Sequence, residues 1–278
     1  ENIAFKIGPI LNAPGRLLDD GAMESFKVIS YEGDYASARQ MAERLNEYNE
    51  ERKELSKSYT ERAMLNIAEN RLLENAPICI YEQNIAEGLV GIIAGRVAEE
   101  FQTPCFVFTD SDDPNVLKGS GRSSKGVNLK AILDANADCL AKYGGHEAAA
   151  GVAVEKSRFK EMSNRLQKTV SEMYPDLDEN MNEVVCYDLE INASHIADTI
   201  NRLEKYSPFG QGNPKPVFLV KDFTLYPRYG NFYQTMGDKD QHIKLFGDGA
   251  DALGFDKSIS YTEANEPKHL DLVGTLSS

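Results

Sequence analysis

The spacing of hydrophobic positions divides the chain into stretches of different character. Residues 34–74 contain no Gly or Pro and carry apolar side chains at helical spacing, which predicts one or two long helices that act as a connector. From residue 77 onward, short apolar runs typical of strands alternate with helical patterns. The strands are expected at 77–81, 104–108, 116–120 and 151–154, and the helices at 88–101, 129–143 and 157–173. Strands that alternate with helices predict an α/β domain.

The last third of the chain has a mostly β pattern. The acidic stretch 174–180 is typical of a linker, and one helix over 194–206 follows it. Short alternating strands are then expected at 217–220, 223–227, 232–236, 242–246, 252–255 and 270–273. Short strands separated by turn signals predict a small barrel.

These patterns divide the chain into four parts. They are a loop-rich start over 1–33, a helical connector over 34–75, an α/β domain with a mixed sheet over 76–174, and a mostly β domain over 175–278. The expected fold class is therefore α/β joined to a mostly β barrel, with a long helix on the N-terminal side. Because the chain starts at Glu1 and ends in a strand-like stretch, we interpret it as a fragment of a longer protein.

The composition is that of an ordinary globular protein. Its 278 residues suffice for roughly two domains, and 41% are hydrophobic while 27% are charged. No apolar run reaches the roughly 18–20 residues of a membrane span and no secretory signal is visible, so we expect a cytoplasmic protein without membrane contact. The cysteines lack the Cys-x-x-Cys spacing of a zinc site, which indicates reduced thiols at Cys79, Cys105, Cys139 and Cys186.

The charge is unevenly distributed. A net charge of −14 argues against a general nucleic-acid binder. However, residues 114–133 contain four Lys or Arg and no acid, and residues 202–247 carry seven Lys or Arg against four acids. An acidic protein with such segments can still present a basic track to phosphates. The alternative is that these charges only form solvated faces.

The most distinctive stretch is the octet 144–151, which reads Gly-Gly-His-Glu-Ala-Ala-Ala-Gly. Gly144 and Gly145 let the backbone turn and approach other groups closely, and His146 follows at once. An imidazole among small residues is suited to contact a phosphate or a sugar. The alternative is a tight turn whose histidine is structural.

A glycine-rich stretch lies about twenty residues upstream and strengthens the first interpretation. It reads Gly119-Ser-Gly-Arg-Ser123, so its glycines free backbone N–H groups, Ser120 and Ser123 supply hydroxyl donors, and Arg122 can grip a phosphate with two hydrogen bonds. The alternative is a hairpin with an exposed arginine. Acidic residues also gather in turn-like sequence without histidine at ligand spacing, and we expect turns there rather than a metal site: Asp110, Asp112, Asp113, Asp248 and Asp251.

These motifs, in this order, resemble the C-terminal part of the RecJ exonucleases of the DHH phosphoesterase superfamily. Residues 7–17 resemble the segment that closes the family's catalytic half, and residues 91–96, 119–123 and 144–151 resemble its DHH-associated domain. The octet is shared with other DHH phosphoesterases, whereas residues 208–218, which resemble the entry to an OB-type barrel, are more specific to RecJ. This chain departs from the family pattern at Ile10, where Arg is usual, and at Ile85-Ala86, where Trp-His is frequent.

The resemblance implies a 5′-to-3′ exonuclease that hydrolyses phosphodiester bonds of single-stranded DNA in repair and recombination. Mn²⁺ or Mg²⁺ would be held by a catalytic half that is not in this chain, so the chain alone is expected to be inactive. The resemblance places Ser120 and Arg122 near the terminal 5′ phosphate. Arg16 either joins the same pocket or anchors the connector through a salt bridge. Because His146 follows a Gly-Gly turn beside a basic segment, we expect it to contact the strand next to the scissile position.

The second domain is expected to hold downstream nucleotides. OB-type barrels pair basic grooves with aromatic residues on which bases stack. Tyr229, Phe232 and Tyr233 are the candidates, although packing roles are equally open for each. Single-stranded DNA is the expected partner, with a single-strand-binding protein and a helicase as further ones.

Two other functions remain open from the sequence. One is a DHH-type phosphoesterase acting on short oligonucleotides or cyclic dinucleotides, which the octet permits and residues 208–218 argue against. The other is a non-catalytic scaffold of replication that keeps the architecture without the chemistry. The metal ligands that would separate a nuclease from a scaffold are not in this sequence.

Overall fold

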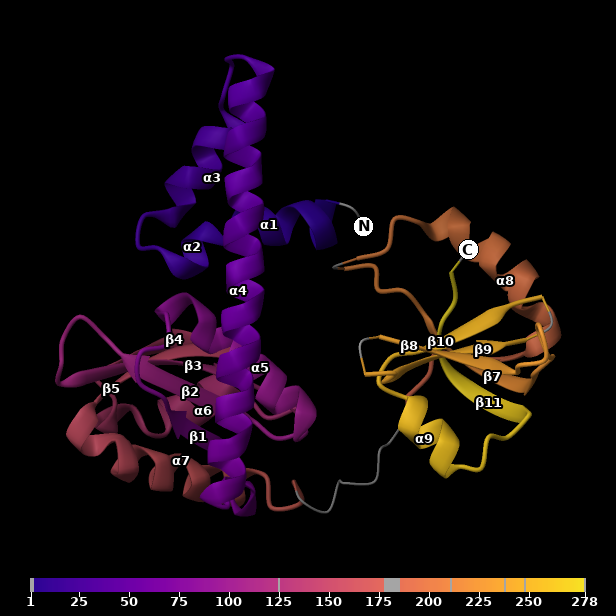
Figure 1. Ribbon diagram of the computed structural model, residues 1–278. Helices are drawn as coiled ribbons and strands as arrows, with labels where there is room; N and C mark the ends of the chain where they lie inside the picture. The colour runs from indigo at the N-terminus through magenta and orange to yellow at the C-terminus, as the bar shows by residue number, and fades with distance from the viewer. Residues whose placement is uncertain are drawn as a thin grey trace. The chain divides into compact units, whose positions relative to one another are not determined.

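The computed structural model describes residues 3–124, 126–177, 186–210, 212–237, 239–247 and 249–277. The chain forms two compact units, residues 1–181 and residues 182–278, which are described separately (Figure 1). The end of the expected linker, residues 178–180, lies outside the described residues, as do Lys125, Gln211 and Asp248.

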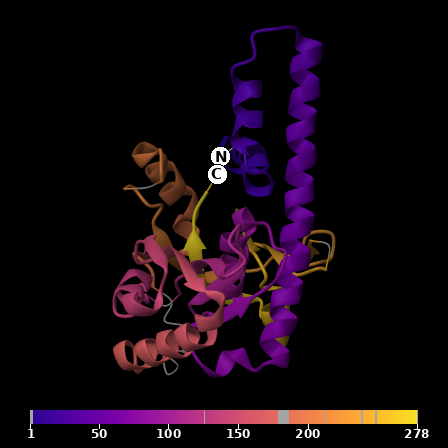
Figure 2. The ribbon, with the colours of Figure 1, turned by 90° about the vertical axis from the view of Figure 1, so that its left-hand side faces the viewer.

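The first unit begins with short helices that lie along one long helix. A helical turn at Ile3–Ile7 leads into α1 (Gly8–Asn12), α2 (Pro14–Leu17) and α3 (Gly21–Ile29), beside the N-terminal half of α4 (Tyr35–Glu69) (Figures 1 and 2). The expectation of a loop-rich start is therefore wrong. Pro9 and Pro14 stand in the first turns of their helices, where a missing N–H costs nothing.

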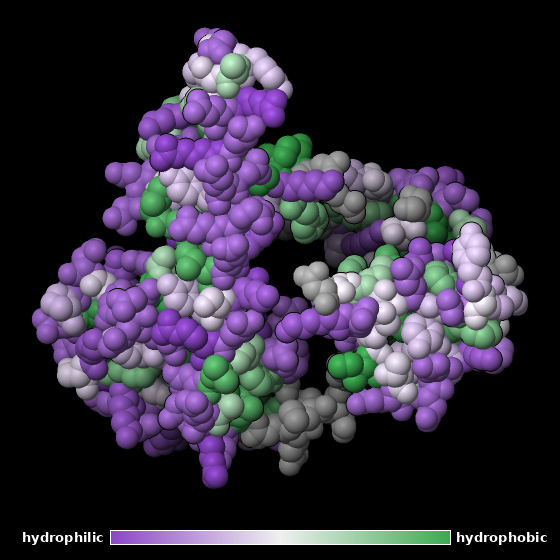
Figure 3. Space-filling model, in the orientation of Figure 1, coloured by the Kyte–Doolittle hydropathy of each residue, from purple (hydrophilic) through white to green (hydrophobic). Residues whose placement is uncertain are grey.

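Helix α4 confirms the long helix that the sequence predicts. It is 35 residues long, roughly 50 Å, and begins where the Asp34 carboxylate accepts a hydrogen bond from the Ser37 N–H at 2.9 Å. Hydrophilic side chains cover most of it on the face drawn in Figure 3. Within the described residues, no helix is long and apolar enough to cross a membrane.

A mixed five-stranded sheet forms the centre of the first unit. Its strands are β1 (Ile78–Tyr81), β2 (Cys105–Asp110), β3 (Val116–Arg122), β4 (Lys142–Gly145) and β5 (Ala149–Glu155), in the order β1-β2-β3-β5-β4. β1 and β2 are parallel, connected through α5 (Glu87–Glu100), and the other pairs are antiparallel. The expected α/β domain with a mixed sheet is confirmed.

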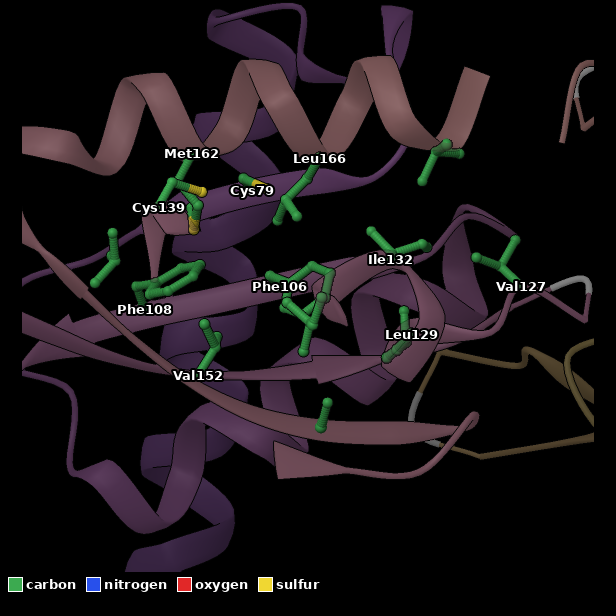
Figure 4. Close-up of a cluster of buried hydrophobic side chains, with 14 of the residues drawn as sticks. Cys79, Phe106, Phe108, Val127, Leu129, Ile132, Cys139, Val152, Met162 and Leu166 are labelled. Carbon is green, nitrogen blue, oxygen red and sulfur yellow. The ribbon is translucent and has the colours of Figure 1, made fainter. Parts of the chain in front are cut away.

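Helices cover both faces of this sheet. Phe106 and Phe108 point toward α6 (Leu129–Asp134) and α7 (Phe159–Met173), where Met162 and Leu166 close the core (Figure 4). On the opposite face, Cys105 and Val107 pack with apolar residues of α5 and with Ala63 and Ile67 of α4. This second face carries the candidate site.

The predicted helix over 129–143 ends early. Asn136 is buried, and its Nδ2 donates to the Ile132 carbonyl at 2.8 Å and to Thr169 Oγ1 at 2.9 Å. A single helical turn at Ala137–Cys139 follows, and the last predicted residues become β4. Pairing of Lys142 and Tyr143 with β5 therefore overrides the helical pattern at the end of this segment.

The second unit contains two three-stranded sheets, β10-β9-β8 and β11-β7-β6. The strands are β6 (Leu189–Asn192), β7 (Val217–Thr224), β8 (Tyr233–Met236), β9 (His242–Phe246), β10 (Asp251–Gly254) and β11 (His269–Thr275), with helices α8 (Ile196–Leu203) and α9 (Ser258–Glu263). A bridge between Leu225 and Gly247 links the sheets. The mostly β character is confirmed, but among the described residues the pairing does not close a barrel, so the barrel prediction is not confirmed. The sequence reading also missed β6 and α9.

Candidate nucleic-acid interface

Glycines on one face of α5 bring two arginines together. A Cβ on Gly88 would lie 2.6 Å from the Cα of Arg16, and a Cβ on Gly91 would lie 2.7 Å from Nη2 of Arg122. Both separations are too short for any real side chain, so only glycine permits these approaches. Arg16 also donates through Nη1 to the Gly88 carbonyl at 3.2 Å. Arg16 of α2 and Arg122 of β3 therefore lie against the same face of α5.

Arg122 is held in place without losing its charge. Its Nη1 donates to Ser120 Oγ and to the Gly121 carbonyl, each at 2.8 Å. Burial and the nearby positive charge of Arg16 lower the pKa of Arg122, although a guanidinium remains protonated in proteins. Ser120 and Arg122 thus form one half-buried unit on β3.

Two further arginines that the sequence analysis did not single out as site residues lie in the same neighbourhood. Arg52 of α4 donates through Nε and Nη2 to Oδ1 of the buried Asn49, at 3.3 and 3.1 Å. Burial and the positive charges of Arg96 and Arg16 lower the pKa of Arg52. We call Arg16, Arg52, Arg96 and Arg122 the arginine cluster. Arg96 is the last residue of the stretch 91–96, which resembles the DHH-associated domain. Nothing in the sequence distinguishes Arg52 from the other charged residues of α4.

Few negative charges act on the arginine cluster among the described residues, and the one that acts on Arg52 is that of Glu50. Across the part of the chain that the structure describes, none of its four guanidinium groups forms an ion pair with a carboxylate. This is unexpected in a chain with a net charge of −14. Like charges brought together in this way destabilise the unliganded protein, so the arrangement is typical of an anion-binding site.

A flat surface of small residues continues from Arg122 across the sheet. The register aligns Arg122 with Ala149 and Ser120 with Gly151, and Gly151 with Gly144. Residues directly opposite each other share a face, so these residues lie on the face of Arg122. A Cβ on Gly144 would meet no atom within 4 Å. We call Gly144, Ala149 and Gly151 the small-residue shelf, which is open to an extended ligand.

His146 stands at the corner of this shelf. It is exposed, its N–H donates to the Ala149 carbonyl at 2.9 Å, and its Nδ1 accepts from the Ala148 N–H at 3.3 Å. In the neutral ring the proton therefore resides on Nε2, which offers a donor to a ligand. Gly145 makes the turn possible, with φ of +143° and no room for a Cβ beside the Ala149 carbonyl. The His146 N–H bonds to Ala149, which the register pairs with Arg122, so the backbone of His146 lies two strand spacings, about 10 Å, from that of Arg122.

Ser123 is engaged elsewhere. Its N–H donates to the Ala148 carbonyl at 2.9 Å, and its hydroxyl donates to the Val127 carbonyl. These bonds fix the loop after β3 against the turn that carries His146. A direct contact of Ser123 with a ligand stays a prediction.

Three of the five acidic residues considered for metal binding have other partners. Asp110 accepts from the Tyr81 hydroxyl at 2.7 Å and from Lys156 Nζ at 3.2 Å, and Asp113 accepts from the Asn115 N–H at 2.9 Å. Asp251 pairs with Arg228 and Lys244 at 2.6 and 3.0 Å. No three His, Cys, Asp or Glu side chains gather in metal-binding geometry among the described residues.

The three candidate stacking residues of the second unit differ in availability. Tyr229 is fully exposed at the tip of a two-residue hairpin, with φ of +52°, a backbone conformation that is costly for a bulky residue. Phe232 is half buried, and Lys268 Nζ lies 4.3 Å from its ring centre. The Tyr233 hydroxyl donates to Glu266 at 2.8 Å and its ring packs edge-on against Tyr261. Tyr229 alone of these three presents a free ring.

Comparison with protein families identifies both domains. The DHHA1 domain model matches residues 75–172, and the RecJ OB domain model matches residues 187–278. The chain is RecJ-like. The single-stranded-DNA-specific exonuclease RecJ of Bacillus subtilis is 26% identical over 282 residues, covering 100% of this chain and 34% of the relative. The RecJ of Dickeya dadantii is 33% identical, covering 78% of this chain and 38% of the relative. The chain thus spans only about a third of the length of these curated relatives.

The fold agrees with a solved RecJ. The crystal structure of RecJ from Thermus thermophilus in complex with Mn²⁺ matches with a TM-score of 0.75 and 25% identity, covering 99% of this chain and 38% of that one. A structure of an exonuclease RecJ bound to manganese matches 65% of this chain and 43% of that one, with a TM-score of 0.54 and 25% identity. The resemblance to RecJ that the motifs indicate is confirmed by these findings.

Proposed function

We propose that this RecJ-like chain supplies the part of a 5′-to-3′ single-stranded-DNA exonuclease that grips the substrate, in DNA repair and recombination. The observation that carries the proposal is the arginine cluster, whose four positive charges have no carboxylate partner among the described residues. Phosphate is the anion that such a site in a RecJ relative is expected to bind.

The terminal 5′ phosphate would bind between Arg16 and Arg122. Nη1 of Arg122 is already bonded to Ser120 Oγ and the Gly121 carbonyl, so its remaining N–H groups face the ligand in a fixed direction. The Ser120 hydroxyl accepts from Arg122, which leaves its own proton for a phosphate oxygen. A guanidinium fixed in this way loses little freedom on binding, which favours affinity.

The strand would then cross the small-residue shelf toward His146. Gly144 and Gly145 leave the backbone accessible there, and the Nε2 proton of His146 can donate to a phosphate or sugar oxygen. The aromatic ring of Tyr229 in the second unit would stack on a downstream base. A single-strand-binding protein and a helicase are the further partners that we propose.

Hydrolysis would depend on a divalent metal, as the manganese in the solved RecJ structures suggests. A divalent ion activates water and neutralises charge on the phosphate. We expect its ligands in the part of the relatives that this chain does not span, so the chain alone should bind a strand without cleaving it. Metal-dependent cleavage by this purified chain would contradict that expectation.

The proposal can be tested with short oligothymidine strands that carry either a 5′ phosphate or a 5′ hydroxyl, measured by fluorescence polarisation in EDTA. The 5′-phosphorylated strand should bind about tenfold more tightly, because it alone reaches both arginines. Affinity should fall as salt rises, with a slope of about −0.7 for each phosphate contacted. Equal binding of the two ends, or a flat salt response, would refute the proposal. Tighter binding of a cyclic dinucleotide, which has no terminal phosphate, would favour a phosphoesterase of small substrates instead.

A further inference from the structure

We propose that Arg52 and Arg96 extend the terminal-phosphate site into a polyphosphate site, so that this protein prefers single strands that end in a 5′-triphosphate. The inference rests on the proposed function, because it takes Arg16 and Arg122 as the binding site of the first phosphate. It adds strands with a 5′-triphosphate to the expected substrates, which the binding site for one terminal phosphate does not by itself imply. Such ends arise whenever a strand is started from a nucleoside triphosphate.

Charge is the first argument. A phosphate monoester carries about two negative charges at neutral pH, and further phosphoryl groups add more. Arg16 and Arg122 are therefore sufficient to balance a monophosphate. Arg52 and Arg96 add two more positive charges that have no carboxylate partner in the described part of the chain. A 5′-triphosphate would match this excess of positive charge, whereas a monophosphate leaves half of it uncompensated.

Position is the second argument. Arg122 lies against Gly91 and Gly95 of α5, directly before Arg96, and Arg16 donates to the Gly88 carbonyl of the same helix at 3.2 Å. The charge of Arg16 acts on both Arg122 and Arg52, and the charge of Arg96 acts on Arg52. The small-residue shelf and His146 extend from Arg122 across β5 and β4, away from the helices that carry Arg52 and Arg96. If the nucleotides of the strand cross the shelf, then only groups attached to the 5′ side of the first phosphate can reach Arg52 and Arg96. Additional phosphoryl groups are the groups that fit there.

The support of Arg52 is the third argument. Asn49 is 5% exposed, and its Oδ1 accepts from both Nε and Nη2 of Arg52. A neutral amide orients the guanidinium and leaves its charge for a ligand, whereas a carboxylate would neutralise it. By contrast, Lys118, on the same face of β3 as Arg122, pairs with Glu87 at 2.8 Å. The positive charge of Lys118 is thus neutralised by Glu87, whereas the positive charge of Arg52 is held by a neutral amide.

Binding of three matched single strands tests the inference. The strands carry a 5′ hydroxyl, a 5′ monophosphate or a 5′ triphosphate, and polarisation is measured in EDTA so that no metal screens the phosphates. The wild-type chain should bind the triphosphate end about tenfold more tightly than the monophosphate end. Equal affinity for these two ends would overturn the inference, while equal affinity for monophosphate and hydroxyl would overturn the proposed function instead.

Variants then locate the preference. The double variant Arg52→Ala, Arg96→Ala should weaken binding of the triphosphate end more than binding of the monophosphate end, so that the two ends bind with similar affinity. Asn49→Asp should reduce the preference with Arg52 still present, because a carboxylate would occupy the guanidinium. Arg39→Ala, which removes a positive charge that pairs with Glu43 on the same helix, is the matched control and should change neither end. A folded double variant that keeps the wild-type preference would refute the inference.

Discussion

The two units treat their positive charges in opposite ways. In the first unit, the arginine cluster has no carboxylate partner among the described residues. In the second unit, four of the seven cations of the basic stretch 202–247 form ion pairs with carboxylates: Arg202, Lys221, Arg228 and Lys244. Their partners Asp198, Asp251 and Asp271 lie outside that stretch. An excess of positive charge in a sequence window therefore does not by itself indicate a group of unpaired cations at one site.

Removal of one guanidinium from each unit should give the largest contrast. Arg122→Ala should weaken binding of a 5′-phosphorylated single strand by about 1.5–3 kcal/mol, roughly ten- to a hundredfold, because it removes charged hydrogen bonds to phosphate. Arg228→Ala should change the affinity by less than about threefold, because Asp251 already compensates that charge. Titration by fluorescence polarisation measures both. A larger loss for Arg228→Ala would reverse the comparison.

The second unit should contribute through its aromatic rings rather than through its charges. Tyr229→Ala should cost about 1 kcal/mol or more, because the exposed ring is free to stack on a base. Tyr233→Ala provides the internal comparison, since that ring is occupied by Tyr261 and Glu266. It should lower the melting temperature more than the affinity. Binding of long strands and thermal melting distinguish these outcomes, and an unchanged affinity in Tyr229→Ala would exclude stacking at this position.

A smaller effect should come from a single methyl group on α5. Gly91→Ala places a Cβ 2.7 Å from Nη2 of Arg122, which must move, so we expect strand affinity to fall about fivefold. Gly95→Ala serves as the control, because its Cβ would be 3.8 Å from Arg122 Cγ, an ordinary contact. Alanine is the better helix former, so Gly95→Ala should raise the melting temperature with affinity unchanged. Equal affinities of the two variants would show that the position of Arg122 does not depend on Gly91.

Local patterns predicted much of the fold and drew attention to Arg122 of the arginine cluster. The glycine-rich stretches led to Arg122 and His146 because their residue types are unusual in sequence, and both residues adjoin Ala149 of β5. Arg52 escaped notice because it is one charged residue among many on α4, and its lack of a carboxylate partner among the described residues is a property of three-dimensional packing. The helix predicted over 129–143 failed because pairing of β4 with β5 outweighs local helical preference. The sequence could not reveal how the strands of the second unit pair, since strand order depends on distant contacts.

The approach of Arg16 to Gly88 has a practical consequence for the design of N-terminal truncations of this protein. The pattern of the sequence suggests a cut before residue 34, where the long helix starts. Such a shortened version would keep the sheet and most of its core, and would pass ordinary checks of folding. It would nevertheless lack one wall of the site, because a residue from the discarded end rests on the glycine of α5. Weak ligand binding by the truncated protein would result from the absence of Arg16, and would not describe the binding properties of the intact molecule.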